Sequence, residues 1–344
     1  MCRHLLTIYI SAQVLILVAR AAEDTPTTFH VAGRVITQQL FANKNAEFFY
    51  RTNTSEFTVD VEGCQWLIEI FPEDKQLFDS AIISCDGNAT YRLLNYTTRL
   101  TDRFAGHIPS YNNIGDAFVS EGVLARDPFV PAASIVWLAY CSSCQFEAAR
   151  AGSQTNLNVP FANYVAAMPV SLLDPPLANR ASFDLSLAPP HLPTKVTYYR
   201  NESDIPQQVA TYFLDTAFTN ISFSASAFTN AGPWSVPTRA SWLGFRPDRD
   251  LGSGGPIRLA VRMTLEADEI LPASTIRQFR PGLGFKTAIT DGRFFASSGF
   301  AFTYYITNKW LSKDEAKGLR QYREAEAAYV QGEGLAKEQL EQSD

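Results

Sequence analysis

Apolar and polar residues alternate from Glu56 to Tyr96, which is the period of a β-strand with one buried face. The phase of the alternation changes at Glu62-Gly63 and again at Asp86-Gly87, two dipeptides that favour tight turns. The segment therefore predicts antiparallel hairpins that share one apolar face. A slip of one residue would send every side chain of a strand to the opposite face, so the pattern should specify the pairing closely.

The same alternation predicts which residues face each other across the two turns. Around Glu62-Gly63, the predicted pairs are Val61 with Cys64, Val59 with Trp66 and Phe57 with Ile68. Around a three-residue loop of Asp86, Gly87 and Asn88, the predicted pairs are Cys85 with Ala89, Ile83 with Tyr91 and Ala81 with Leu93. Pairing Trp66 with Ile83 then joins the two hairpins into one sheet.

Further stretches of alternation predict strands in both halves of the chain. They are Phe29–Val35, Ala46–Arg51, Lys195–Arg200, Tyr212–Ala227, Ile257–Ala267, Phe285–Ile289 and Phe300–Ile306. Helices are expected at Ala132–Arg150 and after Ser312, where Ser312 and Glu315 have the spacing of a capping box. The predicted fold class is mainly β or α+β: a large curved antiparallel sheet, or half-barrel, packed against one or two helices and followed by a C-terminal helix.

The domain organisation starts with a predicted signal peptide at residues 1–21, where an apolar run from Leu5 to Val18 precedes Ala19-Arg20-Ala21. Residues 22–311 are predicted to form a single β-rich domain with a Pro-rich insertion at about 102–191. Residues 312–344 are predicted to form a charged helix and tail. The alternative is two separate β domains that divide near residue 190.

Charge and composition exclude some classes of partner. Removal of the signal peptide takes away Arg3 and Arg20, which leaves 27 basic against 35 acidic residues and a net charge near −8. The chain has no basic cluster, which argues against a nucleic-acid partner. After signal removal no stretch is long enough to be a transmembrane segment. These features predict a soluble exported protein, periplasmic or extracellular.

Four cysteines remain after Cys2 leaves with the signal, and an even count in an exported chain favours disulfides. Cys64 and Cys85 lie opposite each other in the predicted register, which favours a disulfide over two buried thiols. Cys141-Ser-Ser-Cys144 superficially resembles the redox motif of thioredoxin-like proteins, although Tyr140 stands where that family usually has Trp. A structural role is favoured for both pairs, and a thiol oxidoreductase is the less favoured alternative.

Hydrolytic, metal and cofactor chemistry have little support in the sequence. The chain contains no HExxH, GxSxG, Walker or dinucleotide-binding pattern. Asp86 and Asp291 each precede a glycine at a predicted turn and are interpreted as turn residues. We therefore predict no catalytic residues, no metal site and no cofactor, and a protein that is not an enzyme.

Three short motifs carry a resemblance to a known family. Phe57-x-Val59, Trp66-x-Ile68 and Cys85-Asp-Gly-x-x-x-Tyr91 follow one another within residues 56–96. This order resembles the early strands of LolA/LolB-like periplasmic lipoprotein carriers, although the spacing from Trp66 to the Asp-Gly turn is longer here. The chain is also similar to other exported β-rich bacterial proteins. The carrier resemblance implies a half-barrel over helices whose apolar cavity accepts a lipid or a lipoprotein acyl chain.

The leading functional hypothesis is an exported, non-enzymatic protein that binds a lipid or other apolar ligand on the concave face of the sheet. Its motivation is the number of large apolar side chains in the strands, which exceeds what one helix obviously covers. The alternatives are an ordinary dry core and a structural or interaction protein of the cell envelope, whose protein partner the sequence does not identify. The residues predicted to line the ligand face are Phe57, Val59, Trp66, Ile68, Ile83, Tyr91, Val261 and Met263.

Overall fold

The computed structural model describes twelve segments of the chain. They are residues 28–42, 48–75, 78–95, 115–121, 130–151, 180–200, 218–247, 257–272, 278–283, 287–294, 302–305 and 309–324. The predicted signal peptide, residues 1–21, and the part of the predicted tail beyond residue 324 lie outside these segments.

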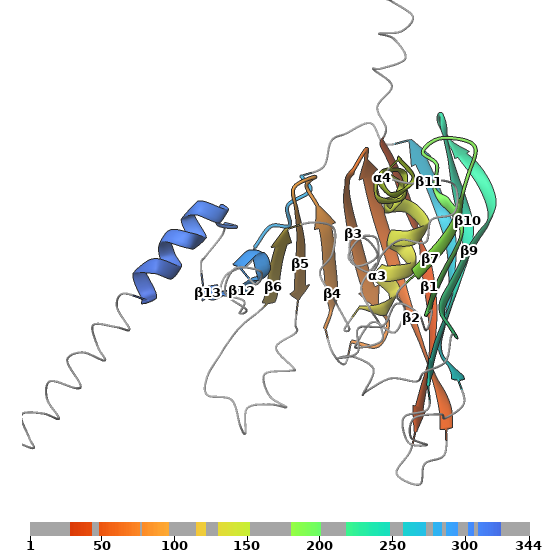
Figure 1. Ribbon diagram of the computed structural model, residues 1–344, viewed down its shortest axis with the longest axis horizontal. Coiled ribbons are helices and arrows are strands. Elements are labelled where there is room, and N and C mark those ends of the chain that lie inside the picture. The colour runs from red at the N-terminus through yellow and green to blue at the C-terminus, as the bar shows by residue number, and fades with distance from the viewer. Residues whose placement is uncertain are drawn as a thin grey trace, which may run out of the picture.

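One open 13-stranded sheet contains strands from both halves of the chain, in the order β13-β12-β6-β5-β4-β3-β2-β1-β11-β10-β9-β8-β7 (Figure 1). The strands of the first half are β1 (Thr28–Ala42), β2 (Phe48–Glu62), β3 (Gln65–Pro72), β4 (Ser80–Cys85), β5 (Ala89–Asn95) and β6 (Gly115–Glu121). Those of the second half are β7 (Arg180–Leu185), β8 (Pro193–Arg200), β9 (Phe218–Ala231), β10 (Trp234–Pro247), β11 (Ile257–Pro272), β12 (Thr287–Asp291) and β13 (Phe302–Tyr305). The predicted fold class is confirmed, except that the sheet is mixed because β6 and β12 pair in parallel.

The two halves meet along β1, which pairs with β2 on one side and with β11 on the other. The pairing of β1 with β11 shifts between Ala32 and Gly33. A Cβ atom added at Gly33 would lie 2.2 Å from the Glu266 carbonyl oxygen, so only glycine allows this close approach of the two strands.

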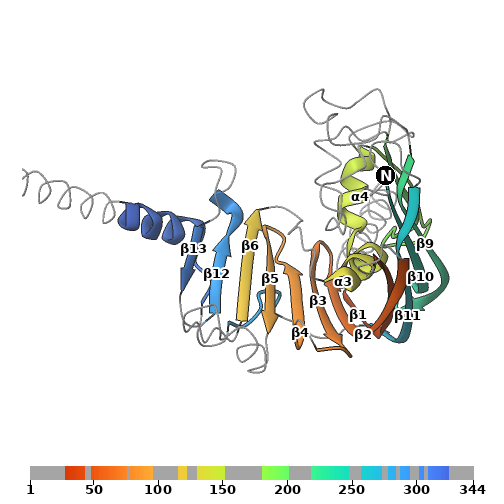
Figure 2. The same ribbon diagram turned by 90° about the horizontal axis from the view of Figure 1, so that it is seen from below.

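A helical segment covers the inner face of the curved sheet (Figure 2). It consists of α3 (Pro131–Val136), the π-helical turn η1 (Trp137–Cys141) and α4 (Ser143–Ala151), and we call residues 131–151 the cover. The helix predicted at Ala132–Arg150 is confirmed in place, but it is interrupted at Ser142, whose hydroxyl donates to the Leu138 carbonyl at 2.9 Å. Single π turns inside helices are frequent at functional sites.

The first predicted hairpin has the right faces and the wrong partners. Val59 lies opposite Ile68, not Trp66, because Gly63 and Cys64 form the turn. The next strand pair moves in the same way, since Trp66 lies opposite Cys85 and Ile68 opposite Ile83. A two-residue shift leaves every side chain on its predicted face, so the alternation could not detect it.

The second predicted hairpin is displaced by one residue, and here the predicted face is wrong. Cys85 lies opposite Thr90, because Gly87 and Asn88 alone make the turn and the Asp86 amide donates to the Ala89 carbonyl. Tyr91 consequently faces Ser84 instead of Ile83. This change moves Tyr91 to the face of the sheet opposite that of Ile83.

Two hydrophobic cores result, one on each side of β4 and β5. The inner core lies between the sheet and the cover and includes the buried side chains of β1–β4 and β7–β11. The second core, which we call the outer core, consists of Ala89, Tyr91, Leu93, Ala117, Val119, Ile289, Tyr304, Leu311 and Ala316.

Three strands were not predicted from the sequence. Two of them, β6 and β7, lie within the Pro-rich stretch where only a helix was expected. The third, β10, contains Pro237, which removes a backbone donor and argues against a strand. The strand accommodates Pro237 next to an irregularity, where Ala227 has a φ of 54° and accepts a hydrogen bond from the Thr238 hydroxyl.

The capping box predicted at the C-terminal helix is confirmed for residues 313–324. The Ser312 amide donates to Glu315 Oε2 at 2.8 Å, and the Glu315 amide donates to Ser312 Oγ at 3.2 Å. Hydrogen bonds from Lys309 and from Ser312 lower the pKa of Glu315 to about 2. Within the described segments, no helix combines the length and apolar character needed to span a bilayer.

Candidate functional site

The inner face contains seven of the eight side chains predicted to contact a ligand. Five lie on β2, β3 and β4, and Val261 and Met263 lie on β11, with β1 between the two groups. Their exposed fractions are 4% or less, so the cover and its neighbours enclose all of them. Tyr91 is the exception, because it belongs to the outer core. Contact of these residues with a ligand stays a prediction.

Aromatic side chains join the cover to the sheet. Tyr140 stacks against Phe57 with 6.0 Å between ring centroids, and its hydroxyl donates to the Pro237 carbonyl at 3.0 Å. Farther along the cover, Phe146 packs edge-on against Phe183 at 4.5 Å. The Tyr140 contacts therefore link β2 and β10, which lie on opposite sides of β1 and β11.

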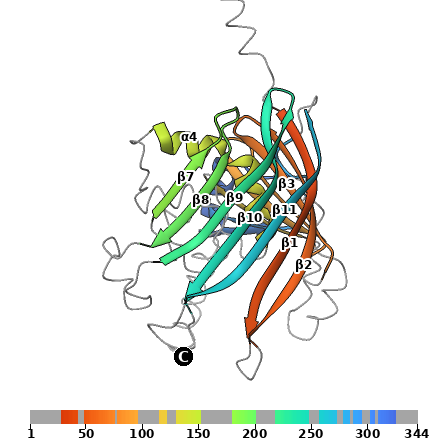
Figure 3. The same ribbon diagram turned by 90° about the vertical axis from the view of Figure 1, so that its right-hand side faces the viewer.

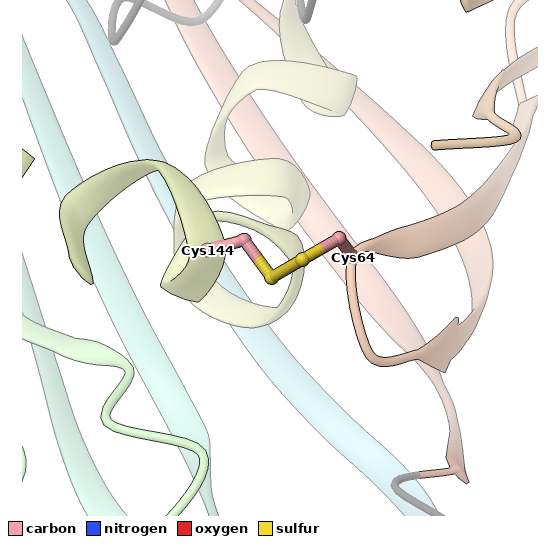
Figure 4. Close-up of a disulfide and its surroundings, with 2 residues drawn as sticks. All are labelled: Cys64 and Cys144. Carbon is pink, nitrogen blue, oxygen red and sulfur yellow. A yellow bond between two sulfur atoms is a disulfide. The ribbon is translucent and has the colours of Figure 1, made fainter. Parts of the chain in front are cut away.

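A disulfide between Cys64 and Cys144, with 2.07 Å between the sulfur atoms, attaches the cover to the β2–β3 turn (Figure 4). The predicted pairing of Cys64 with Cys85 is wrong. The two-residue shift of the hairpin places Cys64 in the exposed turn, whereas Cys85 is buried opposite Trp66. The disulfide fixes the beginning of α4 at one end of the sheet.

The remaining two cysteines are buried free thiols. Burial raises the pKa of Cys85, and burial together with the nearby Cys85 and Asp60 raises the pKa of Cys141 well above its usual value. A buried thiol with a raised pKa forms little thiolate and is a poor nucleophile. Because Cys144 is bonded to Cys64, the geometry argues against the thiol-oxidoreductase alternative.

Four tryptophan side chains of the inner core have indole N–H groups that make no hydrogen bond within the described segments. They are Trp66, Trp137, Trp234 and Trp242, with exposed fractions between 0% and 9%. The hydroxyl of Ser134, on the cover, is also buried without a partner. Buried Trp N–H groups usually find an acceptor, and a buried donor without one costs about 1–3 kcal/mol. This concentration of unpaired donors is therefore a feature of the site that needs a physical explanation.

The surroundings of Trp242 are the most fully defined of the four. Trp242 lies opposite Met263 on β11 and opposite Phe223 on β9. Two residues along β10, Gly244 lies opposite Val261. A Cβ atom added at Gly244 would lie 3.4 Å from Trp242 Nε1 and 3.5 Å from the Val261 Cβ atom. The indole N–H of Trp242 therefore borders the space that the missing side chain leaves.

A paired polar cluster borders the outer core. The Asp86 carboxylate accepts hydrogen bonds from the Asn88 and Ala89 amides, from the Tyr91 hydroxyl at 2.9 Å and from Arg280 Nε at 2.8 Å. Burial alone would raise the pKa of Asp86, but these hydrogen bonds outweigh it and lower the pKa. Burial and the same carboxylate raise the pKa of Tyr91 to about 12.

A buried ion pair lies in the same region. Arg293 donates through Nε and Nη2 to both oxygens of Asp291, and through Nη2 to the Leu311 carbonyl at 3.0 Å. The side chains of Arg293 and Asp291 are 8% and 0% exposed. Asp86 and Asp291 do adjoin turns, as predicted, but their arginine partners were missed. The alternation carries no signal for Arg280, which lies 194 residues from Asp86.

Exposed aromatic residues gather at the end of the β1–β2 hairpin, which extends past the neighbouring strands (Figure 3). Phe41 stacks against Phe49 at 6.0 Å, and Arg258 lies 4.4 Å from the ring centroid of Phe48. Their exposed fractions, with that of Tyr50, lie between 36% and 49%. We call Phe41, Phe48, Phe49 and Tyr50 the hairpin-tip patch.

Ionisable groups elsewhere on the inner side form no obvious metal site. His30 Nδ1 lies 2.8 Å from Asp60 Oδ1, and this pair joins β1 to β2. Among the residues that the structure describes, no group of three or more His, Cys, Asp or Glu side chains is arranged to hold a metal ion.

Comparisons with known proteins were made for both sequence and structure. No family model matches the chain, and no curated protein matches it. A DUF1329 family protein from Desulfovibrio piger is similar over 78% of this chain and 94% of its own, with 8% identity and a TM-score of 0.30. A LolA superfamily protein from Nitrosomonas europaea is similar over 72% of this chain and 87% of its own, with 10% identity and a TM-score of 0.28. The expected LolA-like resemblance thus appears among the structural neighbours, and at these TM-scores it carries no argument about what the chain binds.

Proposed function

We propose that the protein is an exported, non-enzymatic carrier that holds a lipid or another apolar ligand between the inner face of the sheet and the cover. The observation that carries this proposal is the arrangement of one short cover over a wide apolar face. Residues 131–151 alone among the described helices lie on that face, whereas the inner core draws side chains from nine strands and more. A ligand between the two layers would contact the seven enclosed residues predicted for this role.

The attachment of the cover favours movement about one end. The Cys64–Cys144 disulfide is a covalent anchor, whereas Tyr140 and Phe146 attach the rest of the cover by non-covalent contacts. The π turn and the break at Ser142 lie next to the anchored end and give a place where the helix can bend. Displacement of α3 would then open the inner face while the disulfide holds α4.

Export is part of the proposal because a disulfide that joins a turn to a helix persists in oxidising compartments. The predicted signal peptide at residues 1–21 has the same implication.

A second candidate function is a structural or interaction protein of the cell envelope. The observation that favours it is the hairpin-tip patch, because aromatic side chains clustered at the surface commonly mark interaction sites. In this alternative the inner core is permanently filled and the hairpin tip engages a partner.

Native mass spectrometry of the protein, purified without detergent, tests the carrier proposal. We expect a discrete adduct of lipid size that is lost on organic extraction and regained when fatty acid or phospholipid is added back. A clean apo mass, with no uptake of either lipid, would contradict the carrier proposal and favour the interaction protein.

A further inference from the structure

We propose that Trp242 donates its indole N–H to an oxygen acceptor of the bound ligand, in the space beside Gly244. This inference rests on the proposed function and specifies the ligand further. The ligand would be an apolar molecule that carries a carbonyl or ester oxygen within its apolar part, in preference to a plain hydrocarbon.

The first step of the argument is the state of the Trp242 donor. Its side chain is 0% exposed, and its Nε1 atom has no acceptor within the described segments. An unpaired buried N–H is costly, whereas a ligand oxygen would satisfy it. By contrast, Trp310 Nε1, outside the inner core, donates to the Pro281 carbonyl at 2.8 Å.

The second step is the space next to that donor. A methyl group at Gly244 would have its nearest neighbour at 3.4 Å, which is an ordinary contact distance. An atom at this position is also close to the distance at which an oxygen accepts a hydrogen bond from an indole N–H. The backbone therefore leaves room for one small acceptor atom where the donor is unpaired.

The third step is the apolar surroundings. Met263 and Phe223 flank Trp242 on the two neighbouring strands, and Val261 and Ile221 flank Gly244. All four are buried members of the inner core. A small acceptor on an otherwise apolar molecule fits such surroundings, because a charged group would have no partner among these side chains.

The other unpaired donors extend the same chemistry along the strands. Trp242 lies in the row that contains Met263 and Thr37, and Trp66 lies in the row that contains Val61 and Phe29. The two rows are eight residues apart along β1, or about 26 Å at the rise of a β-strand. Unpaired donors thus lie near both ends of the inner core, which suits an elongated ligand or two bound molecules.

The test compares two probes, methyl palmitate and an alkane of the same chain length, by competition with an apolar fluorescent dye. Replacing Trp242 with Phe keeps an aromatic ring and removes only the donor. For Trp242→Phe we expect the affinity for the ester to fall about three- to tenfold, and the affinity for the alkane to stay the same. An equal change for both probes, or no change for either, would contradict the inference.

Two further variants separate the hydrogen bond from a packing defect. Gly244→Ala fills the space beside the indole without a steric clash, so the protein should stay folded and lose affinity for the ester. Trp310→Phe removes an indole N–H that is already paired outside the inner core, so both affinities should remain unchanged. A Gly244→Ala protein that binds the ester normally would overturn the inference. Binding of neither probe by the unmodified protein would instead contradict the proposed function itself.

Discussion

The inner and outer cores treat their polar groups in opposite ways. In the outer-core region, Trp310, Asp86 and Asp291 all have hydrogen-bond partners, and the Tyr304 hydroxyl is the exception. In the inner core, four indole N–H groups are buried without an acceptor. Paired networks stabilise a unique packing, whereas unpaired donors reduce stability. The difference indicates that the outer core is complete as it stands, whereas the inner core would gain stability from a bound ligand.

The largest expected effect comes from breaking the buried ion pair of the outer-core region. Asp291→Asn leaves the guanidinium of Arg293 without its counter-charge, and we expect the free energy of unfolding to fall by about 3–5 kcal/mol. Denaturant unfolding measures this loss. As a control, Glu324→Gln removes an exposed pair with Arg320 and should cost about 0.5 kcal/mol or less. A loss as small as that of the control would show that the outer core does not depend on this pair.

The disulfide gives the next largest effect and sharpens the comparison between the cores. Its cysteines are 80 residues apart, so replacing both Cys64 and Cys144 with Ala should reduce the free energy of unfolding by about 2–4 kcal/mol. Because the disulfide anchors the cover, hydrogen exchange should accelerate first in residues 131–151. Exchange in β5, β6 and β12 should change little. Uniform acceleration in all of these elements would contradict an independently mobile cover.

A smaller effect is expected from pH. The folded-state pKa of Asp86 lies below its usual value of 3.8, so its carboxylate stabilises the fold above that pH. This contribution is lost as the pH falls through the lower folded-state pKa. Asp86→Asn should therefore lower stability by about 1–3 kcal/mol at neutral pH and flatten the loss of stability below about pH 4. Unfolding curves between neutral and acidic pH measure both changes. An unchanged acid profile would show that other carboxyl groups control it.

Much of the sheet followed from alternation, because burial of one face requires a period of two. The strands around Phe57, Ile83 and Met263, and the capping box at Ser312, were predicted for this kind of local reason. Alternation does not distinguish registers that differ by two residues, which is why Trp66 received the wrong partner. Turn length decided the face of Tyr91, and the sequence allowed a turn of either two or three residues at Gly87.

The site was less predictable than the sheet because its contacts join residues far apart in the chain. The partners of Cys64 and Asp86 lie 80 and 194 residues away, and no local period connects them. The strand that carries Trp242 was missed because Pro237 argues against a strand. A tryptophan two residues before a glycine is a signal that would have drawn attention to this part of β10, once the strand was recognised.

The most direct test of ligand binding in the inner core is to follow the indole N–H groups themselves. In the protein labelled with ¹⁵N at tryptophan, each of the five tryptophans gives one indole signal, which Trp→Phe variants assign. On addition of methyl palmitate, we predict a downfield shift of the Trp242 signal, with the Trp310 signal unmoved. Signals that do not respond to the ester, or an equal response of Trp242 and Trp310, would contradict a ligand site between the cover and the sheet.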